Sequence, residues 1–471
     1  MKILSQRFWG HIVKNIQINS KFVKPGDIFV AIPCQNIEAN ISDALQKGAG
    51  IVFAEKSDTL QLDTKKVFTI PDARLIASKL SRFLYPNQPE ICIAVTGTNG
   101  KSSVAHFLSQ IWTYSGIKSS NLGTLGLFIE QKSVSPENIT IPNLTTPDPV
   151  TFHMIMEYLV AQNVNHCVFE ASSHALEQKR CYSATLTAAA FTNLASDHLD
   201  YHKTKEAYLA TKLKLFQEIL PSDKPAVISF DFPEIYQKVS KYNNNIIAFG
   251  MNDKNFVKAR NIREYSDNVV FDLVCGTEVF RQIEIKLLGI FQLMNILCAV
   301  ALALASGLSA PAIADALPKI KSLTGRMEHV RTLNGGEVYV DFAHTAEGLE
   351  TALKCFKKVC KGRLICVFGC GGNRDITKRP EMGRIASQLA DICIVTDDNP
   401  RQESPEEIRK QILESCQGAI EIGNRSEAIY YALSIVSQGD IVAIMGKGHE
   451  TCQIYGTTSV HFSDQEEILA F

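Results

Sequence analysis

A short apolar strand, a glycine-containing turn and a helix that opens with lysine constrain the fold of this chain more than any other feature. The expected strand covers residues 91–95, the turn is Thr96-Gly97-Thr98-Asn99-Gly100, Lys101-Ser102-Ser103 follows it, and the helix runs from Ser102 to Tyr114. In such an arrangement the backbone N–H groups and the helix N-terminus face an anion. Lys101 would place a charge beside the β and γ phosphates of a nucleotide, and the Ser102 hydroxyl could bind Mg²⁺. The segment predicts an ATP site.

Val95 stands where the general form of this phosphate loop has glycine. The alternative interpretation is an accidental Gly-Lys-Ser turn that binds nothing. Because a strand precedes the turn and a helix follows it in register, we favour nucleotide binding.

Short strands alternate with helices along the chain, and this pattern predicts an α/β protein with three sections. A length of 471 residues also exceeds what one ordinary core supports. The expected sections are a small α/β N-terminal domain over 1–88, a central domain with a mostly parallel sheet over 89–325, and a C-terminal Rossmann-like open sheet over 326–471. Residues 85–89, with two prolines, are the expected first linker.

Apolar runs and their spacing predict the individual elements. A helix is expected near 42–47, and strands are expected at 27–32, 50–54, 166–169, 338–340, 364–368, 392–395 and 441–445. Functional groups directly after such strands are typical of a doubly wound sheet.

Composition excludes several classes of protein. The 48 basic and 49 acidic side chains give a formal net charge of -1, without the basic excess that nucleic-acid-binding proteins carry. The apolar stretch at 298–308 is too short to span a bilayer, and the N-terminus has no apolar run of signal-peptide length. The 13 cysteines form no C-x-x-C pair, which indicates free thiols in a reducing compartment. We expect a cytoplasmic protein that binds neither nucleic acid nor a membrane stably.

Three further residues are candidates for the phosphate site. Glu170 ends the strand at 166–169, where a carboxylate could hold a divalent metal; a surface glutamate at a helix start is equally compatible with the segment. His198 lies among several possible metal ligands at 193–202, although such a cluster is often only a polar loop. Lys212 reads as an ordinary helix lysine, and nothing in the residues prefers it over Lys205 or Lys214.

Charged and glycine-rich loops follow three of the C-terminal strands. They are Gly369 to Asp375, Asp397-Asp398-Asn399-Pro400-Arg401 and Gly446-Lys447-Gly448-His449-Glu450. Glycines permit a close approach of backbone to ligand, and the basic groups could hold anions. A plain turn is a fair alternative for the first loop. Because parallel strands end at one edge of a sheet, we expect the loops to gather there.

Taken together, these motifs resemble the Mur ligases of peptidoglycan synthesis, and the resemblance covers nearly the whole chain in order. The phosphate loop with Thr96 before Gly97 is the family's version, which accounts for Val95. The other matching segments are Thr145-Thr146-Pro147-Asp148, Glu170 to Leu176 with Gln178 and Arg180, Asp197 to His202, Asn295, Gly325 to Glu328, and Asp341 to Thr345.

The resemblance implies a UDP-binding N-terminal domain, a central ATPase domain and a C-terminal amino-acid domain. Ser102, Glu170 and His198 would hold Mg²⁺, and Lys212 falls where the family has a carbamylated lysine. Asn295, Arg326 and Asp341 would bind ATP. The UDP-muramoyl dipeptide would contact Ser20, Thr145, Thr146, Ser173, Gln178 and Arg180.

The family's reaction is amide formation through an acyl phosphate, and the last domain indicates which amino acid is joined. The string Asp398-Asn399-Pro400-Arg401 matches the family's diaminopimelate-adding branch. meso-Diaminopimelate carries a distal carboxylate, which Arg401 would bind, and a distal ammonium, from which Glu450 would accept hydrogen bonds. Arg374 and Gly446 would complete the pocket. Lysine lacks the carboxylate, and an unpaired Arg401 would cost about 2–5 kcal/mol.

Two departures concern uridine recognition. The family's Asp-Ser-Arg is Asn19-Ser20-Lys21 here, and its Gly-x-x-x-Asp-Gly-His stretch is replaced at 34–40. Alternative functions are the L-lysine-adding ligase, folylpolyglutamate synthetase, or a nucleotide-binding regulator without ligase activity. The residues at 398–401 and the N-terminal domain argue against folylpolyglutamate synthetase. The set Lys101, Glu170, His198 and Lys212 argues against a regulator. A monomer is expected.

Overall fold

The computed structural model describes residues 6–8, 11–13, 15–56, 65–195, 199–265 and 268–471. Contacts divide the chain into two compact units. One unit consists of Met1–Ala259, Val274–Val279 and Asn295–Ala316, and the other of Arg260–Leu273, Phe280–Met294 and Leu317–Phe471.

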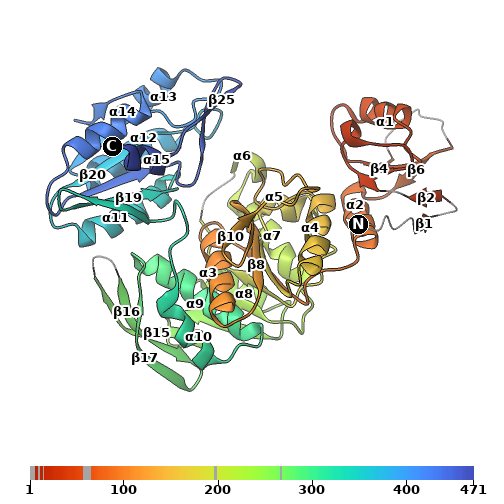
Figure 1. Cartoon of the computed structure of the whole chain (residues 1–471), viewed down its shortest axis with the longest axis horizontal. Helices are drawn as coiled ribbons and strands as arrows, with labels where there is room; N and C mark the ends of the chain where they lie inside the picture. The colour runs from red at the N-terminus through yellow and green to blue at the C-terminus, as the bar shows by residue number, and fades with distance from the viewer. Residues whose placement is uncertain (1–5, 9–10, 14, 57–64, 196–198, 266–267) are drawn as a thin grey trace. The chain divides into compact units, whose positions relative to one another are not determined.

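The N-terminal section is a small α/β fold (Figure 1). Its parallel sheet has the order β3-β4-β5-β6. The elements are β1 (Gln6–Phe8), β2 (His11–Val13), β3 (Ile16–Gln17), η1 (Ser20–Phe22), β4 (Ile28–Ala31), α1 (Ile37–Gln46), β5 (Ile51–Glu55), β6 (Val67–Ile70) and α2 (Ala73–Leu84). Alternate residues of β4 and β5 belong to two apolar clusters, one that includes α2 and one that includes α1. A sheet covered on both faces requires continuous apolar strands, and β4 and β5 have them.

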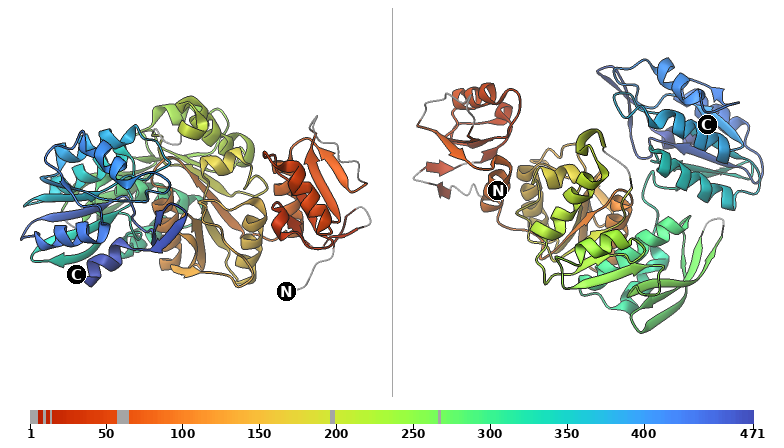
Figure 2. Two further views of the ribbon diagram at one scale, coloured as in Figure 1. Left: turned by 90° about the horizontal axis from the view of Figure 1, so that it is seen from above. Right: turned by 180° about the vertical axis from the view of Figure 1, so that it is seen from behind.

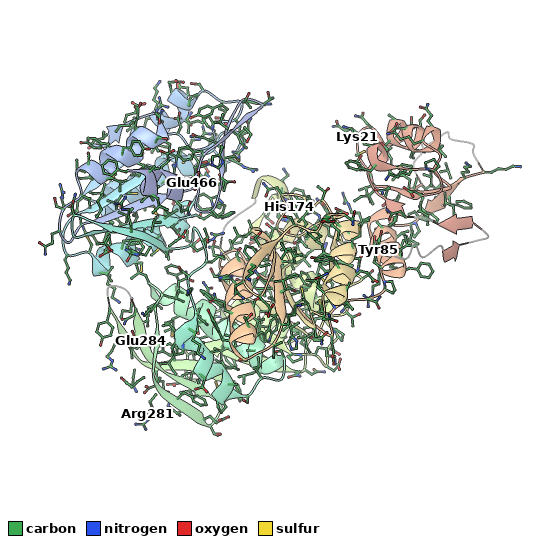
Figure 3. All side chains as sticks on the ribbon, viewed as in Figure 1. Lys21, Tyr85, His174, Arg281, Glu284 and Glu466 are labelled. Carbon is green, nitrogen blue, oxygen red and sulfur yellow. The ribbon has the colours of Figure 1, made fainter. Side chains whose placement is uncertain are left out.

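The central sheet has the order β10-β9-β8-β11-β7-β12-β13-β14-β15-β16-β17, and its strands from β8 through β11 to β15 are parallel. The strands are β7 (Ile91–Thr96), β8 (Ser119–Gly123), β9 (Gly126–Ile129), β10 (Lys132–Val134), β11 (His166–Glu170), β12 (Ala188–Phe191), β13 (Ala226–Ile228), β14 (Ile246–Gly250), β15 (Val257–Glu264), β16 (Val269–Cys275) and β17 (Glu278–Ile285). The last strand is largely exposed, and Figure 3 labels Arg281 and Glu284 on it.

The helices of this section are α3 (Lys101–Tyr114), α4 (Pro149–Ala161), α5 (Ser173–Glu177), α6 (Leu199–His202), α7 (Lys205–Lys214), a π-helical turn η2 (Leu215–Ile219), α8 (Pro233–Val239), α9 (Ile290–Ala305), α10 (Ala310–Ala316) and η3 (Leu317–Lys319). Local chemistry explains several starts. Asp148 accepts from the N–H groups of Val150 and Thr151, and Pro149 occupies the first turn of α4. Within the described residues, no helix combines the length and the apolar character needed to cross a bilayer.

The C-terminal sheet has the order β18-β19-β23-β20-β21-β22, and all its strands except β18 are parallel. Its elements are β18 (Glu328–Leu333), β19 (Gly336–Asp341), α11 (Ala346–Val359), β20 (Leu364–Phe368), α12 (Lys378–Leu389), β21 (Ile392–Val395), α13 (Pro405–Leu413), β22 (Ile420–Glu421), α14 (Arg425–Ser434), β23 (Ile441–Met445), a hairpin of β24 (Cys452–Tyr455) and β25 (Thr458–His461), and α15 (Asp464–Ala470). Helices α11, α12 and α13 pack on one face, and α14 and α15 on the other (Figures 1 and 2).

This architecture confirms the α/β expectation and the strands predicted from apolar runs. The predicted strands at 364–368, 392–395 and 441–445 coincide with β20, β21 and β23. The helix expected near 42–47 instead begins at Ile37, after Asn36. Residues 85–89 lie between α2 and β7 without regular structure.

His153 is fully buried in α4, and neither ring nitrogen has a hydrogen-bond partner among the described residues. Burial lowers the pKa of His153 to about 3, and the positive charge of Arg82 acts in the same direction. The unfolded chain therefore binds one more proton than the folded chain between pH 6.5 and pH 3. The stabilisation by the neutral ring is complete above pH 6.5 and is lost as the pH falls.

We therefore expect His153→Leu to reduce the acid sensitivity of folding. Between pH 7 and pH 5, wild type should lose about 1–2 kcal/mol more unfolding free energy than the variant. Urea unfolding followed by tryptophan fluorescence would measure the difference, since Trp112 is buried in the same section. His106, another buried histidine, is present in both proteins and serves as an internal control. Equal losses in both proteins would contradict the expectation.

Candidate active site

The phosphate loop joins β7 to α3, as predicted, and the loop after β12 supports it. The N–H of Thr98 donates to the Asn193 carbonyl (2.9 Å), and the N–H of Asn99 donates to the Asn193 side chain (3.0 Å). Gly97 and Gly100 have φ of 141° and 83°, which favour glycine. A Cβ on Gly97 would lie 1.9 Å from the Thr192 hydroxyl. The loop shape thus depends on Asn193 and Thr192, which the sequence did not single out.

Two lysines meet at this loop. The Nζ of Lys101 donates to the carbonyls of Gly97 (2.9 Å) and Thr98 (2.7 Å). The Nζ of Lys212 also donates to the Gly97 carbonyl (2.7 Å) and lies 4.4 Å from the centre of the Tyr208 ring. Lys212 is 1% exposed, so it is not the solvated helix lysine that its segment suggests. Position in the fold therefore distinguishes Lys212 from Lys214, whose ammonium pairs with Glu177.

Glu170 lies at the end of β11, beside β7, and is 3% exposed. One carboxylate oxygen accepts from the N–H of Thr124 (2.9 Å), and the other from the Thr124 hydroxyl (3.3 Å). That hydroxyl also lies 3.1 Å from the Thr145 hydroxyl. A Cβ on Gly123 would lie 1.9 Å from the carboxylate. Glu170 is therefore a buried, oriented carboxylate rather than a surface residue. Thr124, which orients it, is a residue that the sequence did not reveal.

Thr146, Gln178 and Arg180 form a connected group beside Glu170. The Thr146 hydroxyl donates to the Glu170 carbonyl (2.6 Å), and Arg180 donates to the Thr146 carbonyl (2.7 Å) and twice to the Gln178 side chain (3.1 and 2.8 Å). Burial lowers the pKa of Arg180. The nearby Ser173 hydroxyl is buried and has no hydrogen-bond partner among the described residues. These groups present hydroxyls and a guanidinium beside the buried carboxylate.

Some predicted residues are not brought into these groups. His198 lies outside the described residues. Ser20 begins η1, and its carbonyl accepts from Lys47 (3.1 Å); no hydrogen bond among the described residues links its side chain to the phosphate loop. In the part of the chain that the structure describes, no three His, Cys, Asp or Glu side chains form a metal-binding group.

Asn295, on α9, is 8% exposed and faces the phosphate loop. A Cβ on Gly100 would lie 2.3 Å from its side-chain oxygen. The loop and α9 therefore approach each other at the residue where α3 begins, which accounts for a glycine at that position.

Arg326 and Asp341 lie near one another in the other unit. Asp341 ends β19, and its carboxylate accepts from the N–H groups of Met327 (2.7 Å) and Ala343 (2.8 Å). Burial raises the pKa of Asp341, and the charge of Arg326 opposes that rise. The Arg326 guanidinium lies over the Phe342 ring (4.3 Å), which also contacts the His449 ring (4.9 Å).

The loops after β20, β21 and β23 meet at one edge of the C-terminal sheet, as predicted. The N–H of Gly372 donates to the Asn399 carbonyl (2.9 Å), and Arg401 Nη1 donates to the Gly372 carbonyl (2.9 Å). A Cβ on Gly372 would lie 1.9 Å from the Pro400 carbonyl, so only glycine permits this approach. Arg374 is exposed on the first loop, and its positive charge acts on Arg401.

Arg401 has a φ of 53°, which is unfavourable for a residue with a side chain. The hairpin after β23 maintains this conformation, because the Arg401 N–H donates to the Ile454 carbonyl (3.0 Å) and the Gly456 N–H donates to the Arg401 carbonyl (2.6 Å). The two side-chain bonds of Arg401 both use Nη1. Burial and then the charge of Arg374 lower the pKa of Arg401. A bound anion would relieve both effects.

Negative groups lie across the same edge. The Glu450 carboxylate accepts from the Asn399 amide (2.8 Å) and from Lys447 Nζ (2.9 Å). Asp398 is 8% exposed, and a Cβ on Gly446 would lie 2.9 Å from its carboxylate. The Gln453 side chain donates to the Asp398 carbonyl (2.7 Å). Lys447 lies in a loop that the sequence singled out, although no role was assigned to it. Gln453 was not identified, because its contact joins segments 55 residues apart.

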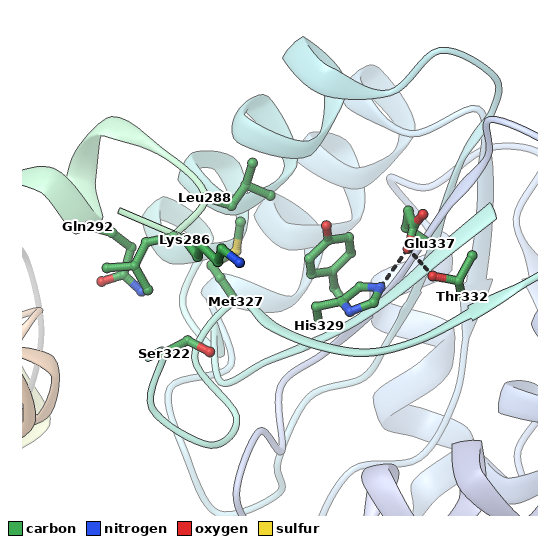
Figure 4. Close-up of a pocket in the computed structure, with 10 residues that line it drawn as sticks. Lys286, Leu288, Gln292, Ser322, Met327, His329, Thr332 and Glu337 are labelled. Carbon is green, nitrogen blue, oxygen red and sulfur yellow. Dashed lines mark hydrogen bonds and ion pairs between the residues drawn. The ribbon is translucent and has the colours of Figure 1, made fainter. Parts of the chain in front are cut away.

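A pocket of about 480 Å³ lies elsewhere, along β18 and β19 (Figure 4). Its lining includes Leu288, Met327 and Tyr339, and a hydrogen bond between the His329 ring and the Glu337 carboxylate (2.6 Å). None of its lining residues is among the predicted site residues.

Comparisons with known proteins identify the family. Residues 95–303 match the Mur ligase middle domain, and residues 325–448 match the Mur ligase, glutamate ligase domain. The chain is 41% identical over 462 residues to the UDP-N-acetylmuramoyl-L-alanyl-D-glutamate--2,6-diaminopimelate ligase of Rhizobium meliloti (strain 1021), covering 97% of this chain and 93% of the relative. This chain belongs to the Mur ligase family.

Another relative and two solved structures are similar to this chain over nearly its whole length. The ligase of the same name from Rickettsia bellii (strain RML369-C) is 38% identical, with 98% of this chain and 96% of the relative covered. A solved structure of a ligase with this name has a TM-score of 0.70 and 31% identity, over 99% of this chain and 96% of that chain. MurF ligase from Thermotoga maritima in complex with ADP shares the fold, with a TM-score of 0.64 at 18% identity, over 100% of this chain and 97% of that chain.

A buried ion pair supports the strand end that carries Gly446 in this Mur ligase. Arg425 and Asp464 are both fully buried and bonded by two hydrogen bonds (2.7 and 2.8 Å), and Arg425 also donates to the Met445 carbonyl (3.1 Å). Removing one member of such a pair leaves an uncompensated buried charge.

Arg425→Met should therefore lower the unfolding free energy by about 3–5 kcal/mol, and adding Asp464→Leu should restore most of it. Urea unfolding would measure both. Lys354→Met is the matched control, since Lys354 pairs with Glu350 on an exposed helix surface and should cost less than about 0.5 kcal/mol. If the double variant is no more stable than Arg425→Met, the charge explanation is wrong.

Proposed function

We propose that this chain is an ATP-dependent ligase that joins meso-2,6-diaminopimelate to UDP-N-acetylmuramoyl-L-alanyl-D-glutamate, with formation of ADP and phosphate. Full-length similarity to diaminopimelate ligases supports the reaction. The observation that carries the amino-acid assignment is the placement of Arg401 and Glu450, opposite charges at one edge of the C-terminal sheet, where both bond to Asn399.

The proposal assigns the UDP end of the substrate to 1–88, ATP to 89–325 and the amino acid to 326–471. Within these ranges, the residues that the resemblance implied keep their proposed roles. The buried hydroxyls and the guanidinium near Glu170 suit the muramoyl dipeptide. We further propose a monomer that works in the cytoplasm.

The donors near the phosphate loop suit Mg²⁺, a cation that prefers oxygen ligands. The Glu170 carboxylate is buried and oriented, and Ser102 lies in the first turn of α3. Bound there, Mg²⁺ would offset negative charge on the phosphates of ATP. Lys212 as an ammonium cannot ligate a cation, whereas its carbamate would be an anion with oxygen donors. Carbamylation of Lys212 is therefore part of the proposal.

In the first step the D-glutamyl carboxylate attacks the γ-phosphate, giving an acyl phosphate and ADP. The residues contribute positioning and electrostatic stabilisation. Backbone N–H groups of residues 100–103, at the positive end of α3, orient the phosphates, and Lys101 offsets the charge that develops at the transferred group. The dipeptide is held in line by the group that Thr146 and Arg180 anchor.

In the second step the amine of diaminopimelate attacks the acyl carbonyl, and the tetrahedral intermediate releases phosphate to form the amide. Arg401 and Glu450 bind the distal end of the amino acid, away from the reacting amine. Arg401 Nε and Nη2 are not used in its two internal bonds and can form a bidentate pair with the distal carboxylate.

A single assay tests the function. Purified protein with ATP, Mg²⁺ and UDP-muramoyl-L-Ala-D-Glu should release phosphate with meso-diaminopimelate, and much less with lysine or glutamate. Release with lysine but not diaminopimelate would show the lysine-adding ligase. Release with a folate and glutamate would show folylpolyglutamate synthetase, and no release under any combination would support a regulator.

Arg401→Ala should raise the KM for diaminopimelate by about 10²-fold, because a charge pair of roughly 2–5 kcal/mol is lost. The dissociation constant for ATP, measured by calorimetry, should change less than twofold. Arg384→Ala is the control, since Arg384 is exposed on α12 and bonds only within that helix. Loss of ATP binding in Arg401→Ala would instead indicate a structural role.

A further inference from the structure

Lys447 follows β23 in the segment Gly446-Lys447-Gly448-His449-Glu450, and its side chain is 0% exposed. Its ammonium donates to three oxygens: the Cys452 carbonyl (2.7 Å), the Glu450 carboxylate (2.9 Å) and the Asn399 side chain (3.3 Å). An ammonium has three donors, so these contacts use its full capacity. No role in the proposed reaction has yet been given to this residue.

Lys447 also fixes the Asn399 side chain in one orientation. The amide oxygen of Asn399 accepts from Lys447 and from the Ile454 N–H (3.0 Å), while its amide nitrogen donates to Glu450 (2.8 Å). A reversed amide would place its NH₂ group against two donors. Lys447, Asn399 and Glu450 thus form a closed ring of hydrogen bonds in which each member orients the other two.

The ring acts on one side of the Glu450 carboxylate. Lys447 and Asn399 both donate to Oε2, and neither donates to Oε1. The Glu450 side chain is 31% exposed, so it remains accessible although it is held. A nearby lysine weakens the attraction of Glu450 for any cation. Lys447 is therefore better explained as a residue that orients the Glu450 carboxylate than as one that increases its attraction for a cation.

We propose that Lys447 is a positioning residue for amino-acid selection: it fixes Glu450 so that Oε1 meets the distal ammonium of the incoming amino acid. This inference rests on the proposed function and deepens it. The substrate class is an amino acid whose far end carries both an ammonium and a carboxylate. Fixing Oε1 relative to Arg401 sets the spacing of the two charges that the pocket accepts.

The test compares two amino acids that differ in one group. 2-Aminopimelate retains the distal carboxylate of diaminopimelate but lacks the distal ammonium. Lys447→Met should raise the KM for meso-diaminopimelate at least tenfold, with the KM for ATP within twofold of wild type. With 2-aminopimelate the same substitution should change KM less than twofold, because Glu450 then has no ammonium to meet. An equal increase for both amino acids would overturn the proposal and indicate a general structural role.

A second pair of variants keeps the test decisive if Lys447→Met folds poorly. In a Glu450→Gln background, Lys447→Gln should add less than a twofold increase in the KM for diaminopimelate, whereas alone it should act as Lys447→Met does. Additive effects would overturn the proposal. Lys354→Met controls for loss of an exposed lysine. Wild-type activity with meso-diaminopimelate is measured in the same series, so its absence would refute the proposed function and not the role of Lys447.

Discussion

Parallel pairing places the carboxyl ends of neighbouring strands at one edge of a sheet, and the chemistry of this chain depends on that constraint. Glu170 ends β11 directly beside Val95 of β7, which leads into the phosphate loop. In the last domain, Asp341 pairs in register with Met445, so the segments after β19 and β23 leave side by side. Residues far apart in sequence thereby meet without any local pattern linking them.

Several charged side chains near these strand ends are buried, and removing a charge from water is unfavourable unless the charge is paired. Lys212, Glu170, Lys447 and Arg425 are all nearly inaccessible, and each has hydrogen-bond partners. An ion in a nonpolar interior costs several kcal/mol unless its partners are well placed, so these contacts determine local geometry more than net stability. The sites are consequently rigid in the places where ligands would be oriented.

Sequence alone predicted the parts of the fold that have strong local signals. β20 and β23 are continuous apolar runs, so their bounds were predicted correctly. β8, with the sequence Ser-Ser-Asn-Leu-Gly, is buried but polar. No apolar run marks it in the sequence, and its pairing with β9 and β11 holds it in the sheet. The site shows the same division. Lys101 and Arg401 lie in recognisable strings, whereas Thr124, Asn193 and Gln453 act through contacts that only the folded chain creates.

The hairpin of β24 and β25 supports the loops that carry Asp398, Arg401 and Lys447. It contacts the Arg401 loop through backbone bonds at Ile454 and Gly456, and it holds Asp398 and Lys447 through Gln453 and Cys452. The backbone bonds of the hairpin to the Arg401 loop do not depend on which side chains the hairpin carries. In the proposed function, two opposite charges, each held by a separate segment, would select a ligand by the spacing between its ammonium and its carboxylate. Attraction alone would accept either ion; fixed spacing requires both.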